Sequence, residues 1–295
     1  MLEAVDWSCV KFIDFYRGKG RPHMHSRLAM LKAFIYMRLA GMGVSEFVRV
    51  LEKHPYKMNI LGFDRLPSES TFSRFKEKVD IERIMTLLNT MIRKENPDYM
   101  CLVGIDSTPI RACKKDPDAR WGYDHINHGW YYGYKAHIFY DLPTLTPLCF
   151  TLTTANVHDS TQLKPLVEKH STNTLLMKGL FADSAYDSKK NVKTMASIGV
   201  TMINRLNKRK SKTKHKYRVQ DCTQIHGNTL NHLYKNRMDC EYTNQLLKER
   251  LDMKQVNTRG KLRVKANLGF SMIARQTQVL YQLKQQANPR TTIIP

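Results

Sequence analysis

The stretch YKNRMDCEYTNQLLK, residues 234–248, decides how the rest of the chain is interpreted. If it forms an α-helix, then at about 100° per residue four polar side chains fall within a stripe roughly 60° wide. They are an aromatic hydroxyl, a guanidinium, a carboxylate and an ammonium group: Tyr234, Arg237, Glu241 and Lys248. Such a stripe suits a polyanion, because the carboxylate can hold a metal ion while the cations contact phosphates. The same spacing is typical of a solvated helix face on which Arg237 pairs with Glu241, and the stretch alone leaves both interpretations open.

The composition shows a large excess of positive charge. The 295 residues include 48 Lys and Arg against 26 Asp and Glu, which gives a formal net charge of +22. This excess favours a polyanionic partner, and nucleic acid is the leading candidate because each neutralised phosphate releases counterions. A membrane surface is the alternative, but the sequence has no apolar run of about 18 residues and no signal-peptide core, so we expect no membrane partner.

Cysteine usage indicates the compartment. Six cysteines are scattered along the chain without a CxxC pair or a Cys/His ladder. This pattern argues against a zinc finger and against a disulfide framework. We therefore expect a protein of the reduced cytosol that is associated with the nucleoid through its nucleic-acid partner.

Hydrophobic periodicity predicts a helical N-terminal domain over residues 1–98. Apolar residues recur at helical spacing in 26–39, a second helix follows, and a third, capped by Ser68 or Ser70, is expected around 71–76. This order fits a DNA-binding helix-turn-helix, and it fits a plain helical bundle nearly as well.

Residues 99–285 have the pattern of an α/β domain, and 286–295 that of a tail. Strands are expected at 101–105, 130–140, 148–154, 175–182 and 200–203, a polar loop at 114–127, and helices after 156, at 189–198 and at 268–283. Three consecutive strands followed by alternating helices and strands predict a mixed sheet with helices on its faces.

Two aspartates share a context that favours metal chemistry. Asp106 follows the apolar run Leu-Val-Gly-Ile, and Asp183 follows Gly-Leu-Phe-Ala. Carboxylates at the ends of neighbouring buried strands repel each other, and Mg²⁺ relieves that repulsion. Glu241, on a helix that crosses those strand ends, would complete the ligand set. The alternative for either aspartate is a helix cap or a turn. The competing acids are expected in loops or turns: Asp116, Asp118, Asp141 and Asp187, with Asp124 as a weaker candidate ligand.

Four motifs in this order resemble the insertion-sequence transposases of the DDE type: Gly-Ile-Asp106-Ser-Thr, Asn156-Val-His-Asp159-Ser, Ala-Asp183-Ser-Ala-Tyr-Asp and Tyr234-(2)-Arg237-(3)-Glu241-(6)-Lys248. The last is similar to the YREK signature of one large group of these enzymes. The resemblance covers about residues 100–285 and implies an RNase H-like catalytic domain. It further implies that Asp106, Asp183 and Glu241 are the catalytic, metal-binding triad. The positions of Tyr234, Arg237 and Lys248 match those that contact transposon-end DNA.

The resemblance implies a Mg²⁺-dependent transposase, with Mn²⁺ as a substitute metal. Two metal ions about 4 Å apart would activate the attacking oxygen and stabilise the leaving one during strand cleavage at the element's ends and transfer into target DNA. The implied partners are double-stranded DNA, from the ends and from the target, and a second copy of the chain in a homodimer assembled on DNA. The alternatives are a nuclease of the same fold that cuts without joining, and a non-catalytic DNA-binding protein derived from a transposase.

Other residues have expected supporting roles. The segment 205–218 carries eight Lys or Arg and no acid, so we expect Lys208, Arg209 and Lys210 to bind the phosphate backbone. His158 is expected to pack or hydrogen-bond near the site and not to bind metal. Ser107 and Thr108 have no general base placed for them by sequence, so they are expected to contact phosphate or to add polarity. Asp159 is expected to cap a helix.

Overall fold

The computed structural model describes residues 1–14, 23–125, 127–169, 176–204, 234–253 and 258–291. The chain forms two compact units. The first contains residues 1–95, 112–118 and 246–295, and the second contains 96–111 and 119–245. The chain therefore leaves the first unit near residue 96 and returns to it after residue 245, apart from the short excursion at 112–118.

The first unit is helical, as the sequence predicts for its N-terminal part. Its elements are η1 (Leu2–Ala4), η2 (Trp7–Asp14), α1 (Arg27–Leu39), α2 (Val44–Lys53), α3 (Pro55–Leu61), α4 (Glu69–Lys76), α5 (Ile81–Glu95) and α11 (Lys261–Lys284). The hydroxyl of Ser26 caps α1 by accepting from Ala29 N, and Ser68 caps α4 by accepting from Thr71 N. α3 and α5 are helices that the periodicity did not predict.

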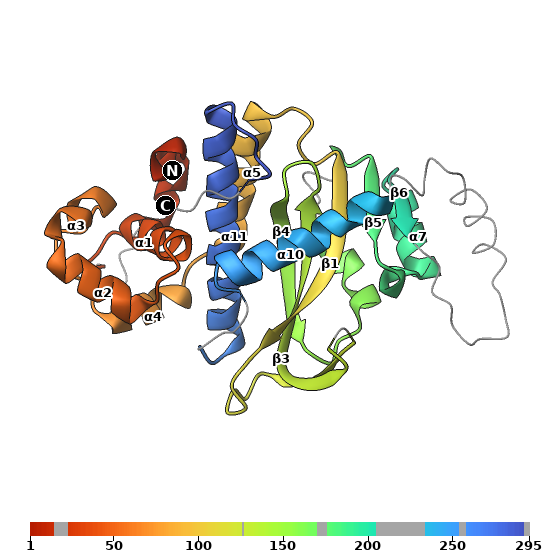
Figure 1. Ribbon diagram of the computed structural model, residues 1–295, viewed down its shortest axis with the longest axis horizontal. Coiled ribbons are helices and arrows are strands. Elements are labelled where there is room, and N and C mark those ends of the chain that lie inside the picture. Colours follow the sequence, from red (N-terminus) through yellow and green to blue (C-terminus); the bar gives the residue numbers. More distant parts are fainter. Residues whose placement is uncertain (15–22, 126, 170–175, 205–233, 254–257, 292–295) are drawn as a thin grey trace. The chain divides into compact units, whose positions relative to one another are not determined.

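The last helix, α11, is the centre of the first unit. It is buried over most of its length and contacts α5 and α1 (Figure 1). The ring of Phe270 stacks on Phe34 with centroids 4.1 Å apart, and Gln276 donates to Asn89 Oδ1 at 2.7 Å. The sequence pattern predicted this helix as part of the catalytic domain. Because the helix is buried over most of its circumference, it needs partners on several sides, and the N-terminal helices supply part of them.

The segment after α11 is also tied to the first unit. The guanidinium of Arg275 donates to the backbone carbonyl groups of Pro289 and Thr291, at 2.6 and 3.0 Å. The described part of the predicted tail is therefore held by hydrogen bonds.

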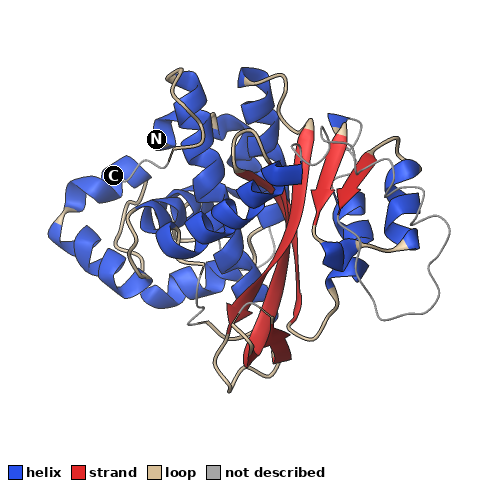
Figure 2. Cartoon of the chain, turned by 45° about the vertical axis from the view of Figure 1, so that its right-hand side comes forward, coloured by secondary structure: helices blue, strands red, loops and turns tan. Residues whose placement is uncertain are grey.

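The second unit is built on a six-stranded mixed sheet with the path β2-β3-β1-β5-β6, in which β4 also pairs with β3. The strands are β1 (Leu102–Arg111), β2 (Arg120–Asp124), β3 (Gly129–Asp141), β4 (Thr146–Thr154), β5 (Gly179–Ala182) and β6 (Thr201–Asn204). β1 is antiparallel to β3 and parallel to β5. This confirms the predicted mixed sheet, and Figure 2 shows the strands side by side.

Three strands differ from the prediction. β5 begins at Gly179 and not at residue 175. β1 does not end before Asp106 but continues to Arg111, because its polar second half still pairs with β3. The expected polar loop at 114–127 contains the strand β2, which pairs with β3 from Arg120 to Asp124.

Short helices complete the second unit: η3 (Asp159–Thr161), α6 (Leu163–Lys169), η5 (Ser184–Tyr186), α7 (Lys189–Ala196), η6 (Lys235–Arg237) and the first part of α10 (Met238–Arg250). α6 contacts β4, and α7 contacts β6. The first part of α10 lies on β1, where a Cβ added to Gly104 would overlap Cys240 Sγ (Figure 1).

Among the described residues, no single helix has the length and apolar composition needed to cross a membrane. The bent pair α1 and α2, at 106° to each other, meets the criterion by length and composition only.

Candidate active site

The sheet brings Asp106 and Asp183 next to each other. Ile105 and Ala182 form the last pair of the parallel ladder between β1 and β5, so the two aspartates are the next residue on each strand. The backbone amide of Ser107 donates to Asp106 Oδ1 at 2.9 Å. The amide of Ser184 donates to Asp183 Oδ1 at 2.6 Å, which makes Asp183 the N-cap of η5. The capping role and the position at the strand end, which the sequence posed as alternatives for Asp183, therefore coexist.

The helix that carries Glu241 is shorter than predicted. α10 begins at Met238, and residues 235–237 form the separate 3₁₀ turn η6. Tyr234 precedes this turn, with the Arg237 guanidinium 6.0 Å from the centroid of its ring. Arg237 Nη2 donates to Glu241 Oε1 at 2.5 Å. The i,i+4 ion pair, which the sequence left as the simpler interpretation, is thus present, and Lys248 lies two turns further along α10.

Electrostatics link Arg237 to all three acids. The pKa of Asp106 is raised to about 7, mainly by burial and also by the negative charges of Asp183 and Glu241, while the Ser107 amide and Arg237 oppose the shift. Burial lowers the pKa of Arg237, but its interactions with Tyr234 and with the three carboxylates outweigh burial, and its pKa is raised overall. Arg237 is therefore the cation that balances this group of acids.

The donor set suits a hard divalent cation, although the carboxylates do not form a closed cage. Among the described residues, no group of three His, Cys, Asp or Glu side chains is arranged to hold a metal ion. The side chain of Glu241 is 55% exposed and engaged by Arg237. Oxygen-only donors are those that Mg²⁺ prefers. The pKa of Asp106 is raised by burial and, to a smaller extent, by Asp183 and Glu241, and a bound cation would stabilise the charged carboxylate against both effects. The residues thus fit a divalent metal by their chemistry.

Asn244 is a site residue that the sequence pattern did not reveal. Its Nδ2 donates to Asp106 Oδ2 at 2.9 Å, and its Oδ1 accepts a hydrogen bond from the buried hydroxyl of Tyr140. Because a phenol hydroxyl donates to the amide oxygen, the amide nitrogen is the group that faces Asp106. Its place one helical turn after Glu241 was the only signal in the sequence.

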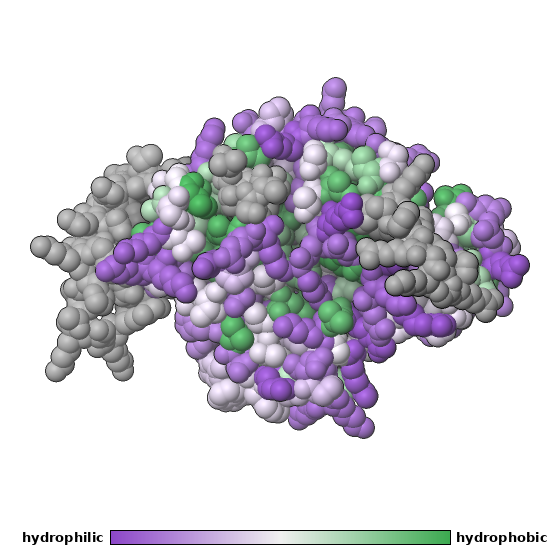
Figure 3. Space-filling model, turned by 180° about the vertical axis from the view of Figure 1, so that it is seen from behind, coloured by the Kyte–Doolittle hydropathy of each residue, from purple (hydrophilic) through white to green (hydrophobic). Residues whose placement is uncertain are grey.

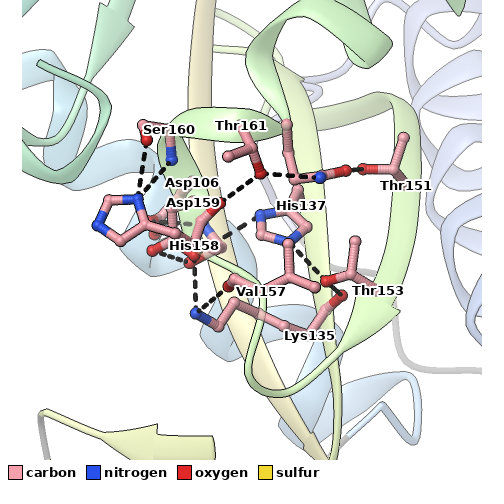
Figure 4. Close-up of polar contacts among 12 residues, drawn as sticks. Asp106, Lys135, His137, Thr151, Thr153, Val157, His158, Asp159, Ser160 and Thr161 are labelled. Carbon is pink, nitrogen blue, oxygen red and sulfur yellow. Dashed lines mark hydrogen bonds and ion pairs between the residues drawn. The ribbon is translucent and has the colours of Figure 1, made fainter. Parts of the chain in front are cut away.

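A second polar cluster lies beside Asp106 (Figure 4). Because side chains alternate along a strand, its member Ser107 points to the other side of β1 from Asp106. Ser107 Oγ donates to Asp159 Oδ2 at 3.0 Å, and Lys135 Nζ donates to Asp159 Oδ1 at 2.8 Å. His137 Nδ1 lies 3.8 Å from Asp159 Oδ1. The expected capping role of Asp159 is wrong: His158 is the N-cap of η3, with its ring nitrogen accepting from Ser160 N. The predicted hydrogen-bonding role of His158 is confirmed.

The competing acids have structural partners. Asp116 and Asp118 accept from the amides of Gly260 and Lys261 at the start of α11. Asp124 accepts from Asn127, and Asp187 is buried. Asp141 was expected in a loop or turn. It is instead the last residue of β3 and accepts from the amides of Met100 and Thr144. The basic residues Lys208, Arg209 and Lys210 lie outside the described residues.

Comparison with protein families identifies both parts of the chain. Residues 100–276 match the family described as "Transposase DDE domain". Residues 1–78 match the family described as "Transposase domain (DUF772)". The probable transposase of insertion sequence element ISH11, from two strains of Halobacterium salinarum, is 23% identical over 289 residues, which cover 93% of this chain and 86% of the relative.

One solved structure supports the fold. The piggyBac transposase in a synaptic complex with hairpin DNA has a TM-score of 0.50 at 10% identity, with 98% of this chain and 74% of that chain covered. The Drosophila P element transposase strand transfer complex has 12% identity and a TM-score of 0.30, with 94% of this chain and 84% of that chain covered. The first likeness supports the RNase H-like fold that the sequence predicts, and the second is too distant to add to it.

The family match covers more than half of the chain, and it agrees with the order of the four motifs and with the sheet that places Asp106 beside Asp183. The family consists of polynucleotidyl-transferring enzymes that generally use divalent metal ions. The chain belongs to the DDE transposases of insertion sequences.

Proposed function

We propose that Asp106, Asp183 and Glu241 form the catalytic centre at which this transposase cuts the ends of its element and joins the freed 3′-OH to target DNA. The observation that carries the proposal is the position of Asp106 and Asp183 directly after an in-register pair of parallel strands, with the helix that bears Glu241 packed on the same strand. Mg²⁺, or Mn²⁺ in its place, would be held by these three carboxylates. When bound, it supplies Lewis-acid stabilisation of the attacking and leaving oxygens.

The remaining residues act on the DNA and on the carboxylates. Arg237 is the cation among the acids, and its planar guanidinium can bind a phosphate in two places where Lys cannot. In the proposed complex Arg237 releases Glu241 and binds the DNA backbone. Tyr234 lies beside Arg237 and Lys248 lies further along α10, and both contact the transposon end. Asn244 fixes one oxygen of Asp106 by a hydrogen bond. Asp183 and Glu241 then adjust their positions to the substrate.

We propose that residues 1–98 bind DNA and that 99–285 carry the catalytic domain. A cavity of about 330 Å³ in the helical unit supports the first part. Its lining includes Arg27, Arg74 and Lys78 and no acidic residue. Arg74 is anchored by hydrogen bonds to Ser70 O and Oγ, so that its guanidinium is held at the surface of α4. Such a cluster suits phosphate contacts that position DNA without reading its sequence. We further propose that the protein assembles as a homodimer on element ends within the nucleoid.

The test replaces each carboxylate by its amide: Asp106→Asn, Asp183→Asn and Glu241→Gln. Amides keep the shape of the side chain but lose the charge that holds Mg²⁺. Each variant should lose strand cleavage in a single-turnover assay and retain binding of the transposon end in a band-shift assay. The matched control is Glu249→Gln, an exposed carboxylate on the same helix, which should cut at the wild-type rate.

Two outcomes would change the proposal. Near-normal cutting by any one amide variant would remove that residue from the triad. A pre-cut 3′-OH end that is bound but never joined to a plasmid would identify a nuclease that cuts without strand transfer.

A further inference from the structure

The hairpin of β2 and β3 has four aromatic rings on one face. The register pairs Trp121 with Tyr132 and Tyr123 with Trp130. Both pairs are edge-to-face, each with ring centroids 5.5 Å apart. Trp121 is 50% exposed, Tyr123 38% and Trp130 69%. We call these four residues the aromatic face.

The opposite face of the hairpin is packed against the core, and this packing explains why the four rings are exposed. A Cβ on Gly122 would lie 2.6 Å from Ala155 Cβ, so the strand is pressed against the end of β4. Tyr131 and Asp124 are buried on the same side. Because side chains alternate along a strand, residues 121, 123, 130 and 132 must then point away from the core. A contiguous patch of exposed apolar rings is typical of a binding surface.

The described acid of the hairpin does not face the aromatic rings. The ring of His125 lies 4.9 Å from that of Tyr123, and the exposed Arg120 at the start of β2 lies on the other side of the strand from Trp121. The carboxylate of the hairpin, Asp124, faces inward, where it accepts from Asn127 and lies 3.7 Å from Arg111. Exposed rings with the nearby acid turned inward are complementary to a nucleic-acid strand whose bases are free to stack.

The position of the hairpin in the sheet places it within reach of DNA at the active site. Gly133 on β3 pairs with Arg111 on one side and Arg120 on the other, so the pair Trp121–Tyr132 is one residue beyond the end of β1. From Asp106 to Arg111 is five residues, or about 17 Å at the rise of an antiparallel strand. This distance corresponds to about five nucleotides along one DNA strand.

We propose that the aromatic face binds unpaired bases of the DNA strand on which the enzyme acts, by stacking on Trp121 and Trp130. A paired duplex hides the faces of its bases, so the face binds DNA where the strands are separated. The inference rests on the proposed function, because it assumes that a DNA end is bound at the carboxylates. It adds a binding site that the triad and the DNA-contacting residues of α10 do not include.

The experiment uses the protein's own fluorescence. The chain has three tryptophans, and two of them belong to the aromatic face, so Trp7→Phe leaves only the two reporters. A single-stranded oligothymidylate should quench their emission, and a duplex of the same length should quench it much less. Trp130→Ala should weaken binding of the single strand by about 5- to 150-fold, which is the usual effect of removing one stacking ring. Trp130→Phe should recover most of the affinity, since it keeps a ring.

Two controls separate stacking from other effects. Leu262→Ala removes an apolar side chain that is 68% exposed on α11 and should leave single-strand affinity unchanged. The salt dependence of binding should be the same in Trp130→Ala and wild type, because the substitution removes no cation that binds phosphate. Thermal unfolding of each variant shows whether the hairpin is intact.

Measuring both single-strand binding and cleavage separates a failure of this inference from a failure of the catalytic proposal. Glu241→Gln should still bind the single strand and be quenched by it, although it does not cut. Equal affinity of wild type and Trp130→Ala for the single strand, with normal cleavage, would overturn the inference and leave the catalytic proposal intact. Conversion of a dimer to a monomer by Trp121→Ala or Trp130→Ala in the absence of DNA, with single-strand binding unchanged, would assign the aromatic face to a second copy of the chain.

Discussion

At the scale of single residues, the hydrogen bond from Asn244 to Asp106 makes a prediction about metal dependence. Asn244→Ala should lower the cleavage rate and raise the Mg²⁺ concentration needed for half-maximal rate, by about 10- to 100-fold, because an outer partner orients the carboxylate it contacts. Tyr140→Phe removes the hydroxyl that fixes the amide and should have a smaller effect in the same direction. Titration of single-turnover cleavage with Mg²⁺ measures both.

The neighbouring residue provides the control for Asn244. Gln245→Ala alters an exposed side chain on the same turn of α10 and should leave the Mg²⁺ titration unchanged. A variant at Asn244 that unfolds at lower temperature but titrates with Mg²⁺ as wild type does would show that Asn244 only packs.

His137 predicts how stability depends on pH. Its pKa is lowered to about 4, mainly by burial and also by the charge of Lys135, while Asp159 opposes the shift. Between the folded pKa and the unfolded value of 6.5, the unfolded chain binds more protons, so the stability that neutral His137 contributes is complete above pH 6.5 and is lost as the pH falls. The slope for one proton is at most about 1.4 kcal/mol per pH unit.

The measurement compares wild type with His137→Gln by thermal unfolding from pH 7.5 to 4.5. The variant should lose less stability on acidification. Asp106 and Asp141, whose pKa values burial raises to about 7 and about 6, contribute with the opposite sign, but they are present in both proteins and cancel in the difference. Parallel curves for the two proteins would contradict the prediction.

The sequence predicted some site residues and missed others for a physical reason. Asp106, Asp183 and Glu241 were proposed because each lies in a recognisable local motif, and the sheet places Asp106 beside Asp183. Asn244 and Lys135 were missed, since their roles depend on contacts across the fold: Asn244 reaches a carboxylate 138 positions away in the chain. Local patterns do not encode such partners.

At the scale of elements, the packing of α10 on β1 makes the next prediction. A Cβ on Gly104 would overlap Cys240 Sγ and lie 2.8 Å from Leu142 Cδ2. Gly104→Ala should therefore push α10 away from the sheet, destabilise the protein by about 1–3 kcal/mol through overpacking, and lower cleavage by displacing Glu241. Thermal unfolding and single-turnover cleavage measure the two effects.

A compensating change provides the sharper test. Cys240→Ala removes the sulfur that the new methyl group meets, so the double variant Gly104→Ala, Cys240→Ala should recover part of the lost stability and rate. Strictly additive losses in the double variant would show that Gly104 is needed for some reason other than the approach of this helix.

The boundaries of elements were predicted less well than their existence. Because of Pro109 and the polar residues before it, the second half of β1 was not predicted as a strand. Proline is tolerated there because the pairing with β5 stops at Ile105, which leaves that edge of the strand without a partner in β5. β2 is only five residues long, and its alternation around Gly122 was too short to separate from a loop. The break between η6 and α10 has no signal in the sequence that we can identify.

At the scale of the whole molecule, positive charge dominates the surface chemistry. Hydrophilic residues cover most of the face in Figure 3, and apolar residues form small separate patches. The net charge of +22 was available from composition alone, and it correctly indicated the polyanionic partner of a transposase. The division into two units could not be predicted from the sequence. The assignment of α11 to the helical unit depends on its tertiary contacts with Ile81, Phe34 and Asn89.

The charge distribution leads to a prediction about salt. The segment 205–218 carries eight Lys or Arg and no acid, so its cations should contribute affinity by binding phosphates and not through sequence preference. Replacing Lys208, Arg209 and Lys210 by Ala should lower the slope of log affinity against log salt by about 0.9 for each phosphate that the segment no longer binds. Binding of a transposon end and of an unrelated duplex, each measured over a range of salt concentrations, gives both slopes.

The paired cations of the surface supply the control for that measurement. Lys164 lies 3.6 Å from Glu168, so its charge is already balanced within the protein, and Lys164→Ala should leave the salt slope unchanged. The triple variant should weaken binding to the transposon end and to the unrelated duplex by the same factor, because interactions with the DNA backbone carry no sequence information. An unchanged slope together with an altered ranking of end sequences would mean that the segment reads bases, and specificity would then have to be sought there and not in the helices of residues 1–98.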